Sequence, residues 1–167
     1  DLSPTELLRR MNNIVRFGTV AEVRLAPPAR VRVQSGDLLT DWLPWSTVRA
    51  GKATVWWPPT LGEQVVLLSP GGDLAQAMAL PACFSDTHPQ PSQSADELRI
   101  QFDNGDTLVH NQAEGSFDLA CTNAITLRAA GSVLTIADGQ VTSNVDVVAQ
   151  GISVVHHKHP GIVKGLA

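Results

Sequence analysis

The sequence contains no tyrosine, only two cysteines and no long hydrophobic run. Cys83 and Cys121 do not form a CxxC motif, so their spacing favours two buried, reduced thiols over a disulfide. No apolar stretch in the chain reaches the roughly 18 residues that a transmembrane helix requires. Because the chain opens with a charged, amphipathic stretch, we expect a protein made without a signal peptide.

Charge of either sign is also scarce. Charged residues make up 17% of the 167 residues, and the formal net charge is −4. The 12 Lys and Arg are scattered among 16 Asp and Glu, whereas a nucleic-acid-binding protein normally presents a basic face. DNA and RNA are therefore unfavourable as partners. The 13 Gly and 11 Pro, together with abundant Thr and Val, indicate a β-rich chain with many turns.

Residues 1–13 predict a short N-terminal helix or arm. Ser3 is placed to be its N-cap, Pro4 to take the first helical position and Glu6 the capping-box position. An apolar stripe extends from Leu7 to Met11. The stripe suits either packing on the helix's own domain or docking to a neighbouring subunit.

Residues 14–84 predict about five short strands with turns between them. In residues 30–34, Val31 and Val33 alternate with polar side chains, as in a half-buried strand. A segment rich in Val, Leu and Trp suits a small closed β-barrel such as an OB-fold. All four Trp lie here without basic residues interleaved, so they are expected to pack in the core or at a subunit interface rather than stack on bases.

Residues 85–96, rich in Pro, Ser and Gln, predict a linker. Residues 97–155 then predict a series of short β segments whose apolar residues alternate with polar ones. Each segment offers too few large apolar side chains to form a core within a single chain. A single-chain β-solenoid or three chains wound around one axis would both cover these faces. The lack of a strict repeat favours the intertwined trimer.

Residues 156–167 contain a His-x-His pair, His157 and His159, with His156 outside the pair. In an extended segment, residues i and i+2 project to the same side, and neutral imidazole is a common ligand of transition metals. One chain offers too few ligands for a closed structural site. On a threefold axis, two His from each of three chains would supply six nitrogens, which suit an octahedral metal. Iron is the natural candidate, with nickel or cobalt as alternatives. The competing interpretation is a solvent-exposed histidine cluster.

The order of these segments resembles the baseplate assembly protein V family, which forms the central spike tip of contractile-tailed phages and has relatives in R-type pyocins. The resemblance covers nearly the whole chain. One position departs from it: family tips often have Gly after the second His, and this sequence has Pro160 there. The matching segments are RFGTV at 16–20, LGEQV at 61–65, FDNGD at 102–106 and VVAQGIS at 147–153.

The resemblance implies a mainly β fold: a short N-terminal helix, an OB-fold barrel, then an intertwined trimeric β-helix or β-prism ending in a metal-clamped apex. It implies one iron per trimer, held in an octahedral six-His site by His157 and His159 of three chains. Some family members also hold Ca²⁺ and Cl⁻ on the axis. The expected homotrimer is a structural spike of a virion or pyocin tail, made in the bacterial cytoplasm. It would attach to the baseplate hub and pierce the host outer membrane mechanically.

Three other functions compete with this interpretation. An enzyme would need a nucleophile–base pair or an open metal position, and His88, His110 and Cys83 look isolated in the sequence. An OB-fold nucleic-acid-binding module would need cationic residues near its aromatics. The tip protein of a related secretion system would share the physics of a phage spike, and the sequence separates the two poorly.

Overall fold

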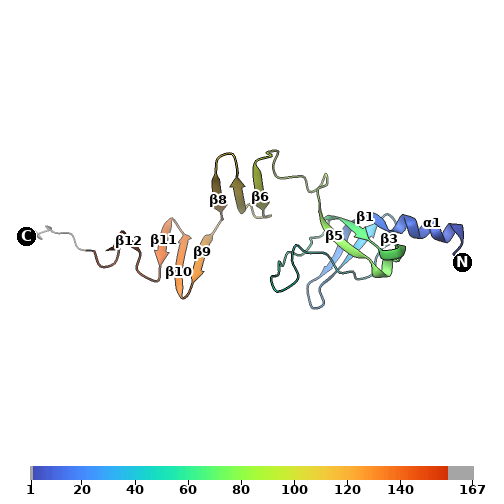
Figure 1. The fold of residues 1–167 in the computed structure, drawn as a ribbon, viewed down its shortest axis with the longest axis horizontal. Helices are drawn as coiled ribbons and strands as arrows, with labels where there is room; N and C mark the ends of the chain where they lie inside the picture. Colours follow the sequence, from blue (N-terminus) through green and yellow to red (C-terminus); the bar gives the residue numbers. More distant parts are fainter. Residues whose placement is uncertain (1, 158–167) are drawn as a thin grey trace, which may run out of the picture. The chain divides into compact units, whose positions relative to one another are not determined.

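The computed structural model describes residues 2–157 and divides the chain into two compact units, Asp1–Gln90 and Pro91–Ala167 (Figure 1). The division falls inside the segment 85–96 that the sequence predicts as a linker. Among the described residues the chain is mainly β, with one α-helix near the N-terminus, as the composition predicts.

Helix α1 (Pro4–Asn13) begins as the capping pattern predicts. The Ser3 hydroxyl accepts a hydrogen bond from the backbone N–H of Glu6 at 3.2 Å, which satisfies one of the free donors of the first turn. The Glu6 carboxylate accepts hydrogen bonds from Arg9 and Arg10 at 2.8 Å, on the solvent side of the helix. These exposed pairs hold the helix surface together but contribute little stability.

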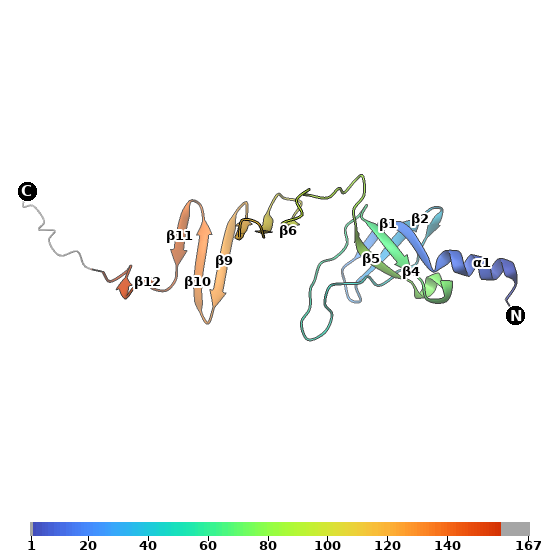
Figure 2. The ribbon, with the colours of Figure 1, turned by 45° about the horizontal axis from the view of Figure 1, so that its top comes forward.

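The first unit is built on an antiparallel sheet in the order β3-β2-β1-β4-β5, in which the first half of β1 (15–19) pairs with β4 and the second half (19–24) with β2. Figure 2 shows these strands crossing beside α1. The strands are β1 (Val15–Arg24), β2 (Arg30–Ser35), β3 (Leu38–Leu39), β4 (Gln64–Leu68) and β5 (Met78–Cys83), and two short 3-10 helices, η1 (Pro70–Gly72) and η2 (Leu74–Gln76), precede β5.

The segment after β3 closes this sheet into a barrel. Leu43 exchanges backbone hydrogen bonds with Val31 of β2, at 2.8 and 2.9 Å. A few residues later, Ala79 of β5 donates to the carbonyl of Pro44 at 3.0 Å and accepts from Ser46 at 2.9 Å. One connecting segment thus bridges the two edges of the sheet, which leaves no long open edge. This is the small closed barrel that the sequence predicts.

The barrel holds the buried core of the chain. Val31 and Val33 are fully buried, as their alternation predicts, and Trp45 packs against the same cluster from its rim. The buried apolar side chains are Val20, Val31, Val33, Leu43, Val65, Leu67, Ala77 and Ala79. All of them lie in the first unit, so among the described residues this unit alone has a buried apolar core, although other apolar side chains of the same unit, such as Phe17 and Trp56, stay exposed.

The second unit consists of short antiparallel sheets that follow one another along the chain (Figure 1). Its strands join in meanders of three, in the orders β6-β7-β8 and β9-β10-β11, and in the hairpin β12-β13. The strands are β6 (Glu97–Gln101), β7 (Thr107–Asn111), β8 (Ser116–Ala120), β9 (Ala124–Ala129), β10 (Ser132–Ala137), β11 (Gln140–Ser143), β12 (Val148–Ala149) and β13 (Ile152–Ser153).

The contact between α1 and the barrel gives a testable prediction at Gly72. This residue has φ +71°, and a Cβ added to it would collide with the backbone of Arg10. Gly72→Ala is expected to lower the free energy of unfolding of the first unit by about 2–4 kcal/mol, because overpacking and left-handed strain each cost about 1–3 kcal/mol. Denaturant unfolding followed by tryptophan fluorescence measures it, since all four Trp lie in this unit.

The matched control is Gly71→Ala. Gly71 also has a positive φ, +61°, but nothing lies within 4 Å of the added Cβ. Only the backbone strain of about 1–2 kcal/mol is then expected. Equal losses in the two variants would show that the close approach of α1 does not matter.

Candidate functional site

The β6-β7-β8 sheet is apolar on one face and polar on the other. Because side chains alternate along each strand, residues in register across the sheet share a face. The apolar face carries two cross-strand rows, Leu98–His110–Phe117 and Ile100–Leu108–Leu119. The opposite face carries Arg99, Val109 and Asp118 in register.

The β9-β10-β11 sheet repeats this division. Its apolar face carries the row Ile125–Ile136–Val141 and, beside it, the pair Leu127–Leu134. Its other face carries three threonines in register, Thr126–Thr135–Thr142. Both meanders are therefore amphipathic: one face is apolar, and the other carries side chains that can hydrogen-bond to water.

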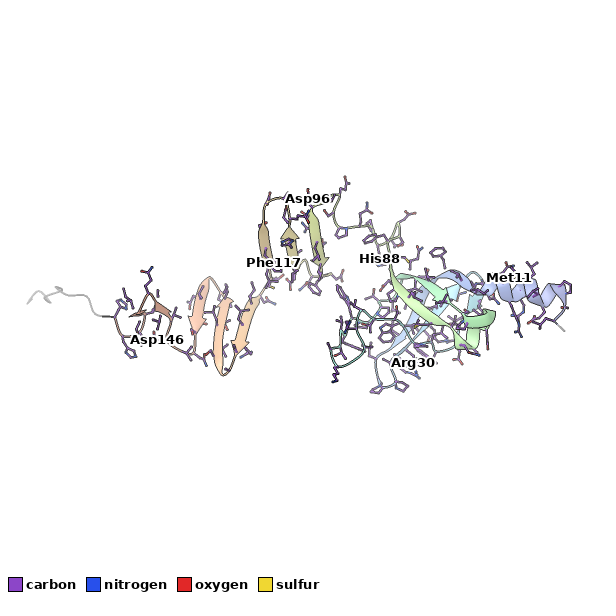
Figure 3. All side chains as sticks on the ribbon, viewed as in Figure 1. Met11, Arg30, His88, Asp96, Phe117 and Asp146 are labelled. Atoms are coloured by element: carbon purple, nitrogen blue, oxygen red, sulfur yellow. The ribbon has the colours of Figure 1, made fainter. Side chains whose placement is uncertain are left out.

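The apolar faces of the second unit are not covered by the chain itself. No apolar side chain of residues 91–157 is buried. Phe117 is 67% exposed, Leu98 59% and Leu127 58%. Figure 3 shows the side chains, with Phe117 labelled on its sheet. Soluble proteins rarely leave contiguous apolar surface of this kind in water, so these faces mark an interaction surface.

A side-chain hydrogen-bond network joins the first meander to the start of the second. Asp106, in the turn before β7, accepts hydrogen bonds from both the backbone N–H and the hydroxyl of Thr122 at 2.7 Å. Asn104 donates a further bond to its second oxygen at 2.9 Å. The hydrogen bonds from Thr122, above all, hold the pKa of Asp106 below its usual range.

The last described residues form a compact turn after β13, not the extended strand to residue 155 that the sequence predicts. His156 donates its backbone N–H to the Ser153 hydroxyl at 2.6 Å, and His157 donates its own to the Ser153 carbonyl at 3.0 Å. The His157 ring Nδ1 lies 2.8 Å from the carbonyl oxygen of Val154. A carbonyl only accepts, so Nδ1 is the donor in this contact.

Only one of the two predicted metal ligands, His157, lies among the described residues. His157 is exposed, and its Nδ1 is bonded in the way typical of ligating histidines. Among the described residues of a single chain, no group of three or more His, Cys, Asp or Glu could hold a metal ion. His159, the second predicted ligand, lies outside the described residues.

The barrel contains a cation–π cluster that the sequence did not reveal. The guanidinium of Arg24 lies 4.8 Å from the ring centroid of Trp42, and that of Arg32 lies 5.9 Å from it. Arg32 also forms an ion pair with Glu22 at 2.7 Å. Trp42 is thus half-buried and in cation–π contact with two arginine side chains.

The other candidate residues make no catalytic pair among the described residues. The sequence suggested that His110 is isolated, but this is wrong. Its side chain lies on the apolar face, with its ring centroid 6.1 Å from that of Phe117. His88 donates its backbone N–H to Ser85 in a local turn. Cys83 and Cys121 are free cysteines, but Cys83 is half-buried and Cys121 exposed, so the prediction that both are buried is wrong. No helix of the described chain is both long and apolar enough to span a bilayer.

Comparison with known proteins agrees with this architecture. Residues 16–84 match the family described as the Type VI secretion system/phage-baseplate injector OB domain. The chain is also 41% identical over 143 residues to the spike protein of Escherichia phage P2. That alignment covers 86% of this chain and 64% of the phage P2 protein, so the chain spans just under two thirds of that relative.

The Asp106–Thr122 link predicts a pH dependence. A carboxylate whose folded pKa is depressed contributes stability that is fully present above its unfolded pKa, about 4. That stability is lost as the pH falls through the lower, folded pKa. The melting temperature of the second unit should therefore decrease as the pH is lowered from about 4 through the folded pKa of Asp106. In Asp106→Asn, the contribution of this carboxylate to the decrease should be absent.

Thr122→Val is the matched variant, because it removes the hydroxyl donor and keeps the carboxylate. NMR titration of the Asp106 carboxyl carbon should show a higher pKa in Thr122→Val than in the unmodified protein. An unchanged pKa would mean that Thr122 does not hold the turn.

Proposed function

The chain belongs to the phage baseplate assembly protein V family, with an injector OB domain at residues 16–84, and on that premise we propose that it is a structural central spike. In this proposal it acts as a homotrimer at the tip of a contractile phage-type tail and catalyses no reaction. One observation carries the proposal. The second unit presents two amphipathic meanders, yet none of its described apolar side chains is buried.

The apolar faces support a trimer because only another surface can cover them. Full burial of one Leu or Phe side chain contributes about 1.5–3 kcal/mol. The rows on β6-β7-β8 and β9-β10-β11 place several such side chains on one face of each sheet. Three copies around one axis would turn these faces inward together and leave the threonine row of β9-β10-β11 in water. The result is the intertwined β-prism that the sequence predicts.

Helix α1 and the barrel support attachment to another protein, which we propose to be the baseplate hub. The backbone of α1 packs closely at Gly72, so the helix is fixed on its domain. Its apolar stripe nevertheless remains in water, with Leu7 51% exposed, Leu8 59% and Met11 58%. Of the two roles that the sequence left open for the stripe, docking to a neighbour fits better than packing on its own domain.

The proposed mechanism of piercing is mechanical. Sheath contraction, driven by other proteins, would push the trimer through the host outer membrane. The ends of three chains would normally fray, which would blunt the tip. His157 and His159 of each chain would together hold one iron, which when bound would cross-link the three ends. The His157 side chain, one of the two proposed ligands, is exposed at the end of the described chain.

One other function shares this geometry. The matching family includes injector domains of Type VI secretion systems, so the tip of a related secretion system is the second candidate. A nucleic-acid module fits less well, because the 12 Lys and Arg are scattered among 16 Asp and Glu and the formal net charge is −4. We assign the phage-type tail because the 41% identity to the phage P2 spike protein extends over 86% of the chain, beyond the OB domain.

The trimer is tested by a charge on the apolar face. Leu127→Asp would bury three carboxylates at the proposed axis, at a cost of several kcal/mol each, and is expected to yield monomers in which the first unit remains folded. Thr126→Asp, one residue away on the threonine face, is expected to stay trimeric. Mass by light scattering distinguishes the two. A monomeric unmodified protein, or equal behaviour of both variants, would overturn the proposal.

The metal-clamped apex is tested by elemental analysis of untagged trimer. We expect about one iron per three chains, with calcium measured in the same assay. The double variant His157→Ala/His159→Ala should lose the iron and melt at a lower temperature, whereas His88→Ala should retain both properties. A stable trimer without transition metal would leave the proposed trimeric spike standing and would eliminate the proposed metal site at its apex.

A further inference from the structure

The outer wall of the barrel carries apolar side chains on three neighbouring strands, β1, β4 and β5 (Figure 2). They alternate with the buried core residues of the same strands, so they point away from the core. In register across the strands they form two rows, Val15–Leu68–Met78 and Phe17–Val66–Leu80. Phe17 is 63% exposed, Val15 55% and Leu68 40%, and the other three are half-buried. These six side chains are called the outer barrel face below.

The outer barrel face repeats the pattern of the meanders in the second unit. There too, two cross-strand rows of mainly apolar side chains lie on one face of three antiparallel strands. The barrel does not need this face for its own core, because that core lies on the inner side of the same strands. An apolar face of this kind, left in water by its own chain, marks a contact with another molecule.

The absence of charge from the outer barrel face suits contact with further copies of this chain. None of its six side chains is charged, and the next row along, Thr19–Gln64–Cys83, is polar but uncharged as well. Where a face meets its symmetry copies at an axis, each side chain approaches its own equivalents. A charged side chain would then meet a like charge, which disfavours association. The outer barrel face avoids this repulsion.

The size of the face also favours a second copy over a separate protein. A standard stable interface has about 20–30 residues on each side. The outer barrel face has six, so it is too small to hold a free partner by itself. Copies that are already joined through the second unit need much less, because a short linker gives the tethered barrels an effective concentration on the order of millimolar.

We propose that the outer barrel face packs against the same face of two further copies, so that the barrels contribute to the trimer interface. This inference rests on the proposed trimer of the second unit. It gives a partner to a surface other than the apolar stripe of α1, for which we propose the hub. The match of residues 16–84 to the injector OB domain does not assign this contact.

Cysteine cross-linking of the whole chain, as the trimer, tests the contact. Phe17→Cys is made in a Cys83→Ser/Cys121→Ser background, so that it supplies the only thiol. A short bismaleimide then joins thiols that lie close together. Because the reagent joins two thiols and each trimer has three, we expect most trimers to yield one covalent dimer on a denaturing gel. Val15→Cys, in the neighbouring row, takes its place if Phe17→Cys does not fold.

The matched control is Asp37→Cys in the same background. Asp37 is exposed in the turn between β2 and β3, outside the face. Its thiols meet only through random motion of the tethered barrels, so this variant is expected to remain mostly monomeric on the denaturing gel. Equal yields of dimer from the two positions would show collision without a specific contact, and would overturn the inference.

A charge on the face provides a second measurement. Phe17→Asp would bury carboxylates between the three copies and is expected to lower the melting temperature of the trimer by roughly 5 °C or more. Val48→Asp is its control, because Val48 is 79% exposed in the same unit but outside the face. This variant should melt with the unmodified protein. Where the two measurements differ, cross-linking decides, because it reports proximity directly.

Failure of the proposed trimer is distinguishable from failure of this inference. Mass by light scattering, measured before the cross-linker is added, would show a monomeric unmodified protein, and that result would overturn both. A trimer in which Phe17→Cys and Val15→Cys give no more dimer than Asp37→Cys would overturn the barrel contact alone. The face would then be left to a different protein, such as the hub.

Discussion

The apolar faces of the second unit are the constraint on which the rest of the structure depends. The barrel buries Val31, Val33, Val65 and Leu67 completely within one chain. The meanders bury none of their described apolar side chains, although their register gathers these side chains on one face. Their strands are joined by backbone hydrogen bonds but enclose no buried apolar core. Short sheets of this kind are not stable alone. Whatever covers these faces determines whether the unit folds.

The proposed spike follows from combining an independent barrel with a dependent prism. A barrel that is stable by itself can present α1 and its exposed stripe as a fixed attachment surface. A prism whose core is shared among chains is locked along its whole length, because no chain can withdraw without exposing the faces of the others. The two units thus suit different mechanical duties, attachment for one and rigidity for the other. Local side-chain bonds, such as those of Asp106 and Asp146, order the turns that the shared core does not reach.

Local patterns predicted the regular elements well. The Ser3 cap and the burial of Val31 and Val33 follow from the sequence alone. The prediction failed near residue 155, because Asp146 and Ser153 capture backbone N–H groups that a longer strand would have used. The contact of Arg24 and Arg32 with Trp42 was equally invisible, since it joins residues far apart in the sequence. Likewise, no sequence pattern predicted the turn in which the Ser153 carbonyl accepts the backbone N–H of His157.

A shared core also has a consequence for the life of the newly made chain. The barrel can fold as soon as it leaves the ribosome, at any concentration, whereas the order of the prism would depend on the meeting of three chains and so on roughly the third power of their concentration. Each chain would then pass through a state in which the barrel is folded and the second unit is not, with unpaired strand edges and apolar faces exposed to water. Such a state is prone to aggregate or to pair out of register. The association of three chains would then be the rate-limiting step of assembly. A high local concentration of newly made chains would speed it.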